Sequence, residues 1–159
     1  MTNYETQLER VKRFYARVQD QDRLQVDYED DVWSFFIHAW HLKDYLDKFL
    51  KTTALDFGLW KEIDKYESLK IAHDVANLEK HYTLEDKLRP DGSLRPGKLN
   101  TRKLRKELTV SIGPSGVHSG YNYILIDENG NEHAVLDVGK EIIIDWQKII
   151  LAMESNFRK

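Results

Sequence analysis

The sequence predicts an α+β fold, namely a bundle of about four helices with a small antiparallel β-meander between the third and the last helix. Two observations predict it. Apolar residues recur at helical spacings in the first half of the chain and again at its end, whereas they alternate with polar residues between Leu104 and Asp137. The length of 159 residues is that of one domain, so residues 1–159 are expected to share one core.

The first two helices are expected over residues 4–20 and 30–50. One apolar stripe runs along the first helix, and charged residues occupy its opposite face. The second helix is apolar over most of its circumference, which predicts a central place in the bundle. The apolar residues are Tyr4, Leu8, Val11, Tyr15 and Val18 in the first helix, and Val32, Phe35, Phe36, Ala39, Leu42, Leu46 and Phe49 in the second.

A third helix is expected to begin at Lys61 or at Glu67 and to end at His81 or Tyr82, which completes a helical part over residues 1–82. Small residues on its buried face would let it approach the second helix closely. A loop is expected over residues 83–103, because two prolines and two glycines form turn signals there.

The β-meander is expected over residues 104–137. Alternation predicts one strand that ends before Pro114 and two more strands joined by an Asn-Gly hairpin turn. The last helix is expected over residues 138–156, with Asp137 as its N-cap. Its aliphatic face should pack on the sheet or on the other helices.

The composition excludes several classes of protein. The chain has no cysteine, which excludes disulfides, thiolate metal sites and cysteine nucleophiles. A signal peptide and a stretch of about 18 apolar residues are both missing, so we expect a cytoplasmic protein with no membrane partner. The glycine signatures of phosphate-binding loops, dinucleotide-binding folds and hydrolase nucleophile elbows are also missing, and no cofactor is predicted.

The charge is unevenly distributed along the chain. The net charge is -3, but the segment from Lys87 to Lys106 contains eight basic residues and one acid, which leaves the rest of the chain strongly acidic. A basic stretch on an acidic domain indicates a polyanion-binding edge, although a solvated loop and strand edge has the same composition. The expected nucleic-acid-binding residues are Lys98, Arg102, Lys103, Arg105 and Lys106.

Two polar clusters interrupt the apolar helices. His41 and Asp44 are one turn apart in the second helix, and Asp74, Asn77 and His81 share one face of the third. If these helices are antiparallel neighbours, the clusters meet in one site, where a carboxylate beside an imidazole suits general-base chemistry. The same residues would equally form a buried hydrogen-bond network that holds two helices in register. No metal is predicted, because metal-binding spacings such as His-Glu-x-x-His are missing.

The two clusters carry a family resemblance. An aromatic-His-Leu-x-Asp segment at Trp40–Asp44, followed by Asp-x-x-Asn-x-x-Lys-His at Asp74–His81, resembles small bacterial and phage proteins. Their helical part is similar to the HEPN class of four-helix RNases and nucleotide-handling domains. The resemblance covers roughly residues 1–82, and the basic loop and the strands are outside it.

The resemblance to the HEPN class implies metal-independent RNA cleavage at a homodimer interface. His81 matches the catalytic histidine, which would act as base on a ribose 2′-hydroxyl while a cation stabilises the phosphorane. Asn77 most nearly matches the polar residue of the family motif. The motif arginine is absent, because Asp74, Val75 and Ala76 occupy the positions where it would stand. Lys80 is the nearest replacement cation, but it lacks the bidentate geometry of a guanidinium.

Two functions therefore compete. The first is a HEPN-like protein that acts on RNA in a defence or toxin setting, with His81 and Asn77 central and with Asp74, His41 and Asp44 in support. The second is a non-catalytic adaptor that contacts a partner protein through the β-meander or the basic edge. In that case the polar clusters only stabilise the helix pair.

Overall fold

The computed structural model describes residues 2–20, 25–80, 99–127 and 129–157. Within these ranges the chain is mostly helical and carries one antiparallel sheet, which confirms the predicted α+β class. The elements are α1 (Asn3–Gln19), α2 (Gln25–Thr53), α3 (Leu59–Ile63), α4 (Glu67–Lys80), β1 (Leu99–Gly113), β2 (Gly116–Asp127), β3 (Glu132–Ala134) and α5 (Val135–Phe157).

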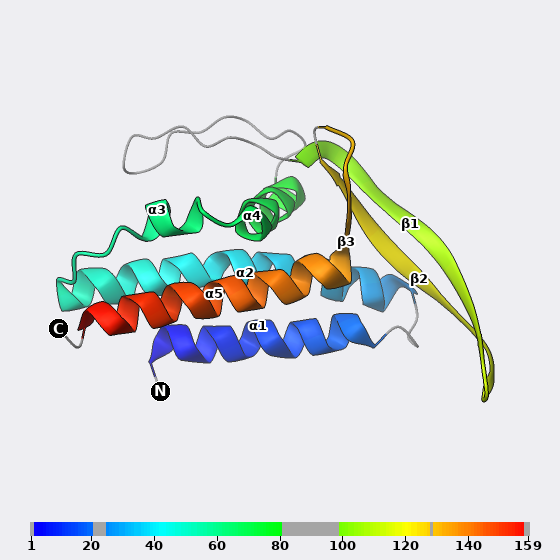
Figure 1. Cartoon of the computed structure of the whole chain (residues 1–159), viewed down its shortest axis with the longest axis horizontal. Helices are drawn as coiled ribbons and strands as arrows, with labels where there is room; N and C mark the ends of the chain where they lie inside the picture. The colour runs from blue at the N-terminus through cyan, green and yellow to red at the C-terminus, as the bar shows by residue number, and fades with distance from the viewer. Residues whose placement is uncertain (1, 21–24, 81–98, 128, 158–159) are drawn as a thin grey trace.

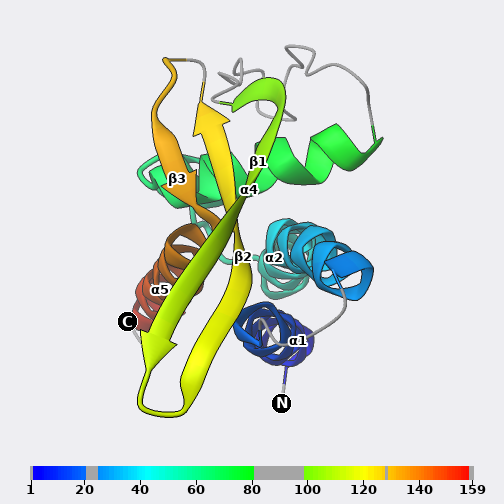
Figure 2. The same cartoon turned by 90° about the vertical axis from the view of Figure 1, so that its right-hand side faces the viewer.

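Helices α1, α2 and α5 lie side by side along the length of the molecule (Figure 1). The short α3 leads into α4, which crosses α2 steeply instead of running alongside it, as Figures 1 and 2 both show. The antiparallel pairing that would join the two polar faces is therefore not formed. The helices do touch, but only where they cross.

The core is built around α2, as the sequence predicts. Phe35, Phe36 and Leu42 are fully buried there, and α2 contacts α1, α4 and α5. Trp146 and Ile142 of α5 are fully buried against the same core. Each such side chain stabilises the fold by about 1.5–3 kcal/mol relative to an exposed position. None of the helices in the described part of the chain combines the length and hydropathy needed to cross a membrane.

Helices α1 and α5 are joined at both ends. The Tyr4 hydroxyl donates to Glu154 Oε1 over 3.1 Å, and the Tyr15 hydroxyl donates to the Leu136 carbonyl over 2.9 Å. Gly139 makes the second contact feasible, because a Cβ at that position would lie 2.7 Å from Cε2 of Tyr15. A glycine is thus required where the Tyr15 ring of α1 packs against α5.

Two helices begin earlier than the sequence predicts. Helix α2 starts at Gln25, because Tyr28 is buried and extends the apolar face by one turn. Helix α5 starts at Val135, which is also buried, and β3 ends one residue before it. Asp137 therefore lies in the first turn of α5, where its charge complements the helix dipole, and the prediction that it is the N-cap is wrong.

The third predicted helix is divided by a turn into α3 and α4. Helix α4 begins at Glu67, the later of the two expected starts, and is described to Lys80. His81 and Tyr82, the expected ends, lie outside the described residues.

The three strands form one antiparallel sheet in the order β1-β2-β3, which confirms the β-meander. Strand β1 begins at Leu99, so residues 99–103 are strand and not loop, whereas 83–98 lie outside the described residues. At its base the sheet packs on the bundle through Tyr123 and Leu125, and Tyr28 of α2 stacks on Tyr123 with ring centroids 5.2 Å apart. The β1–β2 hairpin then projects past the helices (Figures 1 and 2).

Candidate functional site

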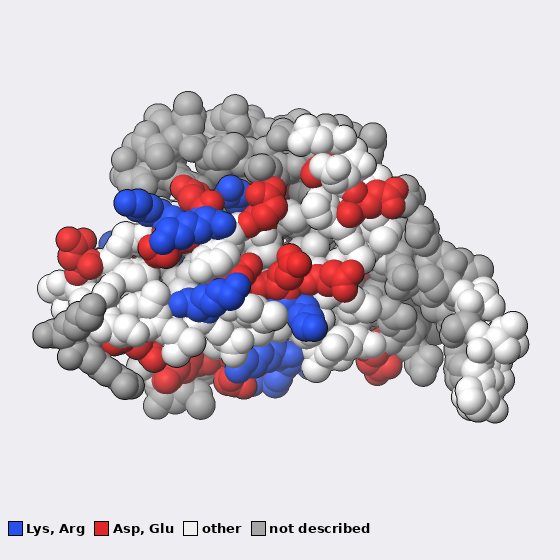
Figure 3. Space-filling view, in the orientation of Figure 1, with Lys and Arg blue, Asp and Glu red and all other residues white. Residues whose placement is uncertain are grey.

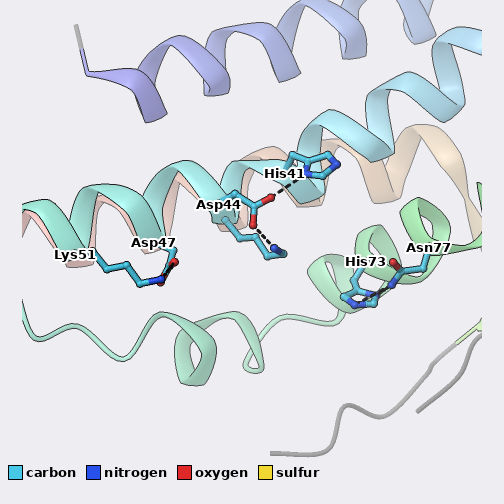
Figure 4. Close-up of polar contacts among 7 residues, drawn as sticks. His41, Asp44, Asp47, Lys51, His73 and Asn77 are labelled. Carbon is cyan, nitrogen blue, oxygen red and sulfur yellow. Dashed lines mark hydrogen bonds and ion pairs between the residues drawn. The ribbon is translucent and has the colours of Figure 1, made fainter. Parts of the chain in front are cut away.

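His41 and Asp44 form a pair on the surface of α2 (Figure 4). His41 Nδ1 lies 2.8 Å from Asp44 Oδ2, and Lys43 donates to the other carboxylate oxygen. Partial burial works to raise the pKa of Asp44, but the hydrogen bonds from Lys43 and His41 outweigh it and lower that pKa. An ionised Asp44 favours the tautomer with its proton on Nδ1, which leaves the lone pair of a neutral ring on Nε2.

The polar cluster of α4 is centred on His73, which was not among the expected catalytic residues. The Asn77 amide nitrogen lies 2.6 Å from Nδ1 and 2.9 Å from Nε2 of the His73 ring. His73 Nδ1 also lies 3.4 Å from Asp74 Oδ1. Asp74 is completely buried, His73 is nearly so, and Asn77 is half-buried. The signal for His73 was its position one turn before Asn77 and next to Asp74.

Aromatic rings connect the two clusters. The ring of Trp40 on α2 contacts the ring of His73 on α4, with centroids 4.3 Å apart. Trp60 of α3 adds a second indole 6.2 Å from Trp40. Lys43 Nζ lies 5.3 Å from the centroid of Trp40 and 5.5 Å from that of Trp60, which is within the range of cation–π attraction. The site thus combines an exposed His–Asp pair, a cation held by aromatic rings and a buried imidazole cluster.

Of the five expected catalytic residues, the four that the structure describes do not form one site. His41 and Asp44 are paired with each other, whereas Asn77 is paired with His73. Asp74 and Asn77 share a helical face but reach different depths, since only Asp74 is completely buried. His81 lies outside the described residues.

The expected nucleic-acid-binding residues fall mainly on β1. Its backbone includes Arg102, Lys103, Arg105 and Lys106, and Lys98 lies outside the described residues. In the backbone register Arg105 pairs with Ile124 and Lys106 with Tyr123. On the face of the bundle drawn in Figure 3, acidic and basic side chains are instead interspersed over the helices.

A third polar cluster, at the turn between β2 and β3, was not foreseen. Asp127 Oδ1 accepts from the backbone N–H groups of Asn129 and Asn131, each over 2.9 Å, and Oδ2 accepts from Asn131 Nδ2 over 2.8 Å. His133 Nε2 lies 3.2 Å from Oδ2. The side-chain hydrogen bond from Asn131 is the largest cause of a pKa of Asp127 well below its usual range. The cluster fixes the turn, in which Gly130 takes a positive φ of 83°.

None of the three polar clusters resembles a metal centre. Over residues 2–20, 25–80, 99–127 and 129–157, no three histidine, aspartate or glutamate side chains are grouped so that they could hold a metal ion.

Comparison of the chain with protein-family models, with curated proteins and with solved structures found no match.

Proposed function

We propose that the protein binds RNA, with phosphates contacting the basic residues of β1 next to the polar segment of α4. The contact between α4 and β1 carries this proposal. It makes neighbours of the helix that carries Asn77 and the strand that carries Arg102, Lys103, Arg105 and Lys106. The concentration of positive charge between Lys87 and Lys106 in an otherwise acidic chain supports it, because phosphate contacts dominate nucleic-acid affinity.

The resemblance to the HEPN class extends the proposal to metal-independent cleavage of the bound RNA in a defence or toxin setting. His81, which follows the last described residue of α4, would take the proton of a ribose 2′-hydroxyl, and that oxygen would attack the adjoining phosphorus. The bond from phosphorus to the 5′-oxygen of the next nucleotide would break, and that oxygen would take up a proton, which leaves a 2′,3′-cyclic phosphate. Asn77 would position the histidine or the phosphate. Because Asp74 is completely buried, its part in this chemistry is to hold His73 and not to touch RNA.

The paired His41 and Asp44 supply an alternative acid–base group for the same reaction. Their pairing suits a general base, and it does not depend on residues outside the described ranges. A neighbouring cation, Lys43, lies over the indole rings of Trp40 and Trp60. Trp40 is buried, whereas the partly exposed Trp60 offers a stacking surface for a base.

Cleavage is tested by incubating the parent chain and the His81→Ala and His41→Gln variants with total tRNA and mRNA in EDTA. Cleavage by the parent but not by one variant assigns the base to that histidine, provided that the variant melts at the parent temperature. If the parent chain binds RNA but does not cleave it, the protein is an RNA-binding protein and not a ribonuclease. A parent chain that neither binds nor cleaves RNA would refute the proposal.

Binding is tested with a matched pair of double variants. Arg105→Gln/Lys106→Gln removes two charges from β1, and Lys48→Gln/Lys61→Gln removes two exposed charges from the helices. We expect fluorescence anisotropy with single-stranded RNA to show weaker binding for the first variant, and near-parental binding for the second. Equal losses would indicate attraction to net charge alone and would count against a site on β1.

The burial of Asp74 and His73 favours a second candidate, an adaptor in which the polar cluster only holds α4 on α2. For an adaptor, variants at His73 would lower stability, while the parent would bind no RNA at any salt concentration. The two candidates are thus separated by RNA binding of the parent chain.

A further inference from the structure

The free end of the β1–β2 hairpin exposes three apolar side chains on one face. The exposed fractions are 60% for Val110, 85% for Ile112 and 68% for Val117. Ile112 pairs directly with Val117, and Val110 is two residues from Ile112, so the three residues share one face of the hairpin. We call these three residues the apolar tip.

The apolar tip continues a face that is buried elsewhere. Tyr123 and Leu125 of β2 lie on the same face, because they are an even number of residues from Val117, and both are buried against the bundle. The hairpin carries this face past the end of the helices (Figure 1), and the described part of the chain does not cover it there. Exposed apolar surface at the end of a projecting element is typical of an interaction site.

Strand β1 is also an edge strand, since within the described sheet it pairs with β2 alone. Edge strands that remain unpaired are protected by charged residues, and β1 has these from Arg102 to Glu107. The segment from Leu108 to Ile112, with sequence Leu-Thr-Val-Ser-Ile, has no charge and high β-propensity. The protection of the edge thus ends where the apolar tip begins.

We propose that two copies of this chain pair through the edge segments Leu108–Ile112, antiparallel and about a two-fold axis at Val110. The sequence of the segment is complementary to itself in this register. Val110 lies opposite its own copy, Leu108 opposite Ile112, and Thr109 opposite Ser111 on the other face. The nearest charges, on Lys106 and Glu107, then lie opposite the uncharged turn of the second copy, so no like charges oppose each other.

The pairing would satisfy the outer backbone groups of both edge segments and bring both copies of Val110 and Ile112 into contact side by side on one face of the joined sheet. A shared stretch of five residues on each side is small for a protein interface. The dimer should therefore form at high protein concentration and dissociate on dilution. This interface involves neither α4 nor the His41–Asp44 pair, and it does not use the basic residues of β1, the nearest of which, Lys106, lies two residues before Leu108.

Cysteine cross-linking tests the register, because the chain has no cysteine of its own. In Val110→Cys the two Cα atoms would lie about 5 Å apart across the new strand pair, which is within the range for a disulfide. Val117→Cys is the matched control, since it is equally exposed and on the same face, but it lies on β2. The two control cysteines would be separated by three strand spacings, about 14 Å, and also offset by four residues along the strands, about 13 Å, which is too far.

We expect mild oxidation at high concentration to give covalent dimers of Val110→Cys but not of Val117→Cys. Cross-linking of both variants to a similar extent would indicate hairpins stacked face to face, and cross-linking of neither would indicate no pairing at the tip. Either result overturns the proposal.

Sedimentation equilibrium gives a second readout that needs no oxidation. Val110→Lys places like charges directly opposite each other and should weaken dimerisation by ~tenfold or more, whereas Val117→Lys adds the same charge farther away and should have a much smaller effect. A parent chain that is monomeric at every concentration, or a dimer that is unaffected by Val110→Lys, would also overturn the proposal. Circular dichroism checks that both variants fold.

Discussion

The imidazole of His73 on α4 packs against the indole of Trp40 on α2, with the ring centroids 4.3 Å apart and the ring planes at 65°. This edge-to-face contact lies where the two helices cross, and both side chains are buried. It explains how polar segments on helices that are not antiparallel still come together. The contact links the surface pair on α2 to the buried cluster on α4.

Replacing His73 by leucine should destabilise the fold even though leucine is apolar. The Asn77 amide loses its imidazole partner in a nearly buried position, and we expect a loss of about 1–3 kcal/mol in the free energy of unfolding, measured with urea. His41→Leu is the control, because its ion pair is exposed and exposed pairs contribute about 0–1 kcal/mol. Similar losses for the two variants would contradict the central role of His73.

Replacing Gly139 by alanine should destabilise the fold, although the same change in an exposed helix stabilises by about 1 kcal/mol. The new Cβ would lie 2.7 Å from the Tyr15 ring, which must then shift against Phe35, and overpacking of this kind costs about 1–3 kcal/mol. Lys140→Ala, an exposed change in the next residue of α5, should leave stability nearly unchanged. A Gly139→Ala variant that melts above the parent would show that the helices have room to separate.

Replacing Asp127 by asparagine should have an effect that depends on pH. Because hydrogen bonds lower the pKa of Asp127 in the folded state, its carboxylate contributes stability that is fully present above the unfolded pKa of about 3.9 and is lost only as pH falls through the lower folded value. The stability difference between parent and variant should therefore persist from pH 7 to about pH 4 and shrink below it. Urea titrations at several pH values measure it, and the exposed Asp56→Asn is the control.

Neutralising Arg105 and Lys106 should change the salt dependence of RNA binding. Each phosphate contact contributes about 0.7 to the slope of log affinity against log salt for a single strand, so loss of two contacts should flatten the slope by about 1.4. Anisotropy titrations at several salt concentrations measure the slope. Weaker binding with an unchanged slope would mean that the two residues support the fold of β1 and do not contact phosphates.

The sequence predicted the helices in which apolar residues recur at a regular helical spacing. The stripe of α1 and the nearly all-apolar α2 were correctly placed, because burial on those faces dominates their energetics. The early starts of α2 and α5 were not predicted. Tyr28 and Val135 are buried by contacts with other elements, and the local sequence does not show these contacts. Local signals that favour a strand or a coil give way there to tertiary packing.

The candidate site was predicted in composition and not in geometry. The spacing of His41 and Asp44 within one helix fixed their pairing, which the structure contains. The relation between α2 and α4 depends on a crossing angle that no pattern within either helix specifies. For that reason the sequence placed Asp74 in a shared polar site, whereas it is completely buried beside His73.

The hydrogen bond from Tyr4 to Glu154 joins residues that are 150 positions apart. Contacts of such long range make the chain close a large loop before the bundle gains its third long helix, which slows folding. On the ribosome, α1 and α2 emerge well before α5. The apolar face around Phe35 and Phe36 therefore stays exposed until Ile142 and Trp146 of α5 have been synthesised. We therefore expect the nascent chain to depend on chaperones until synthesis reaches α5.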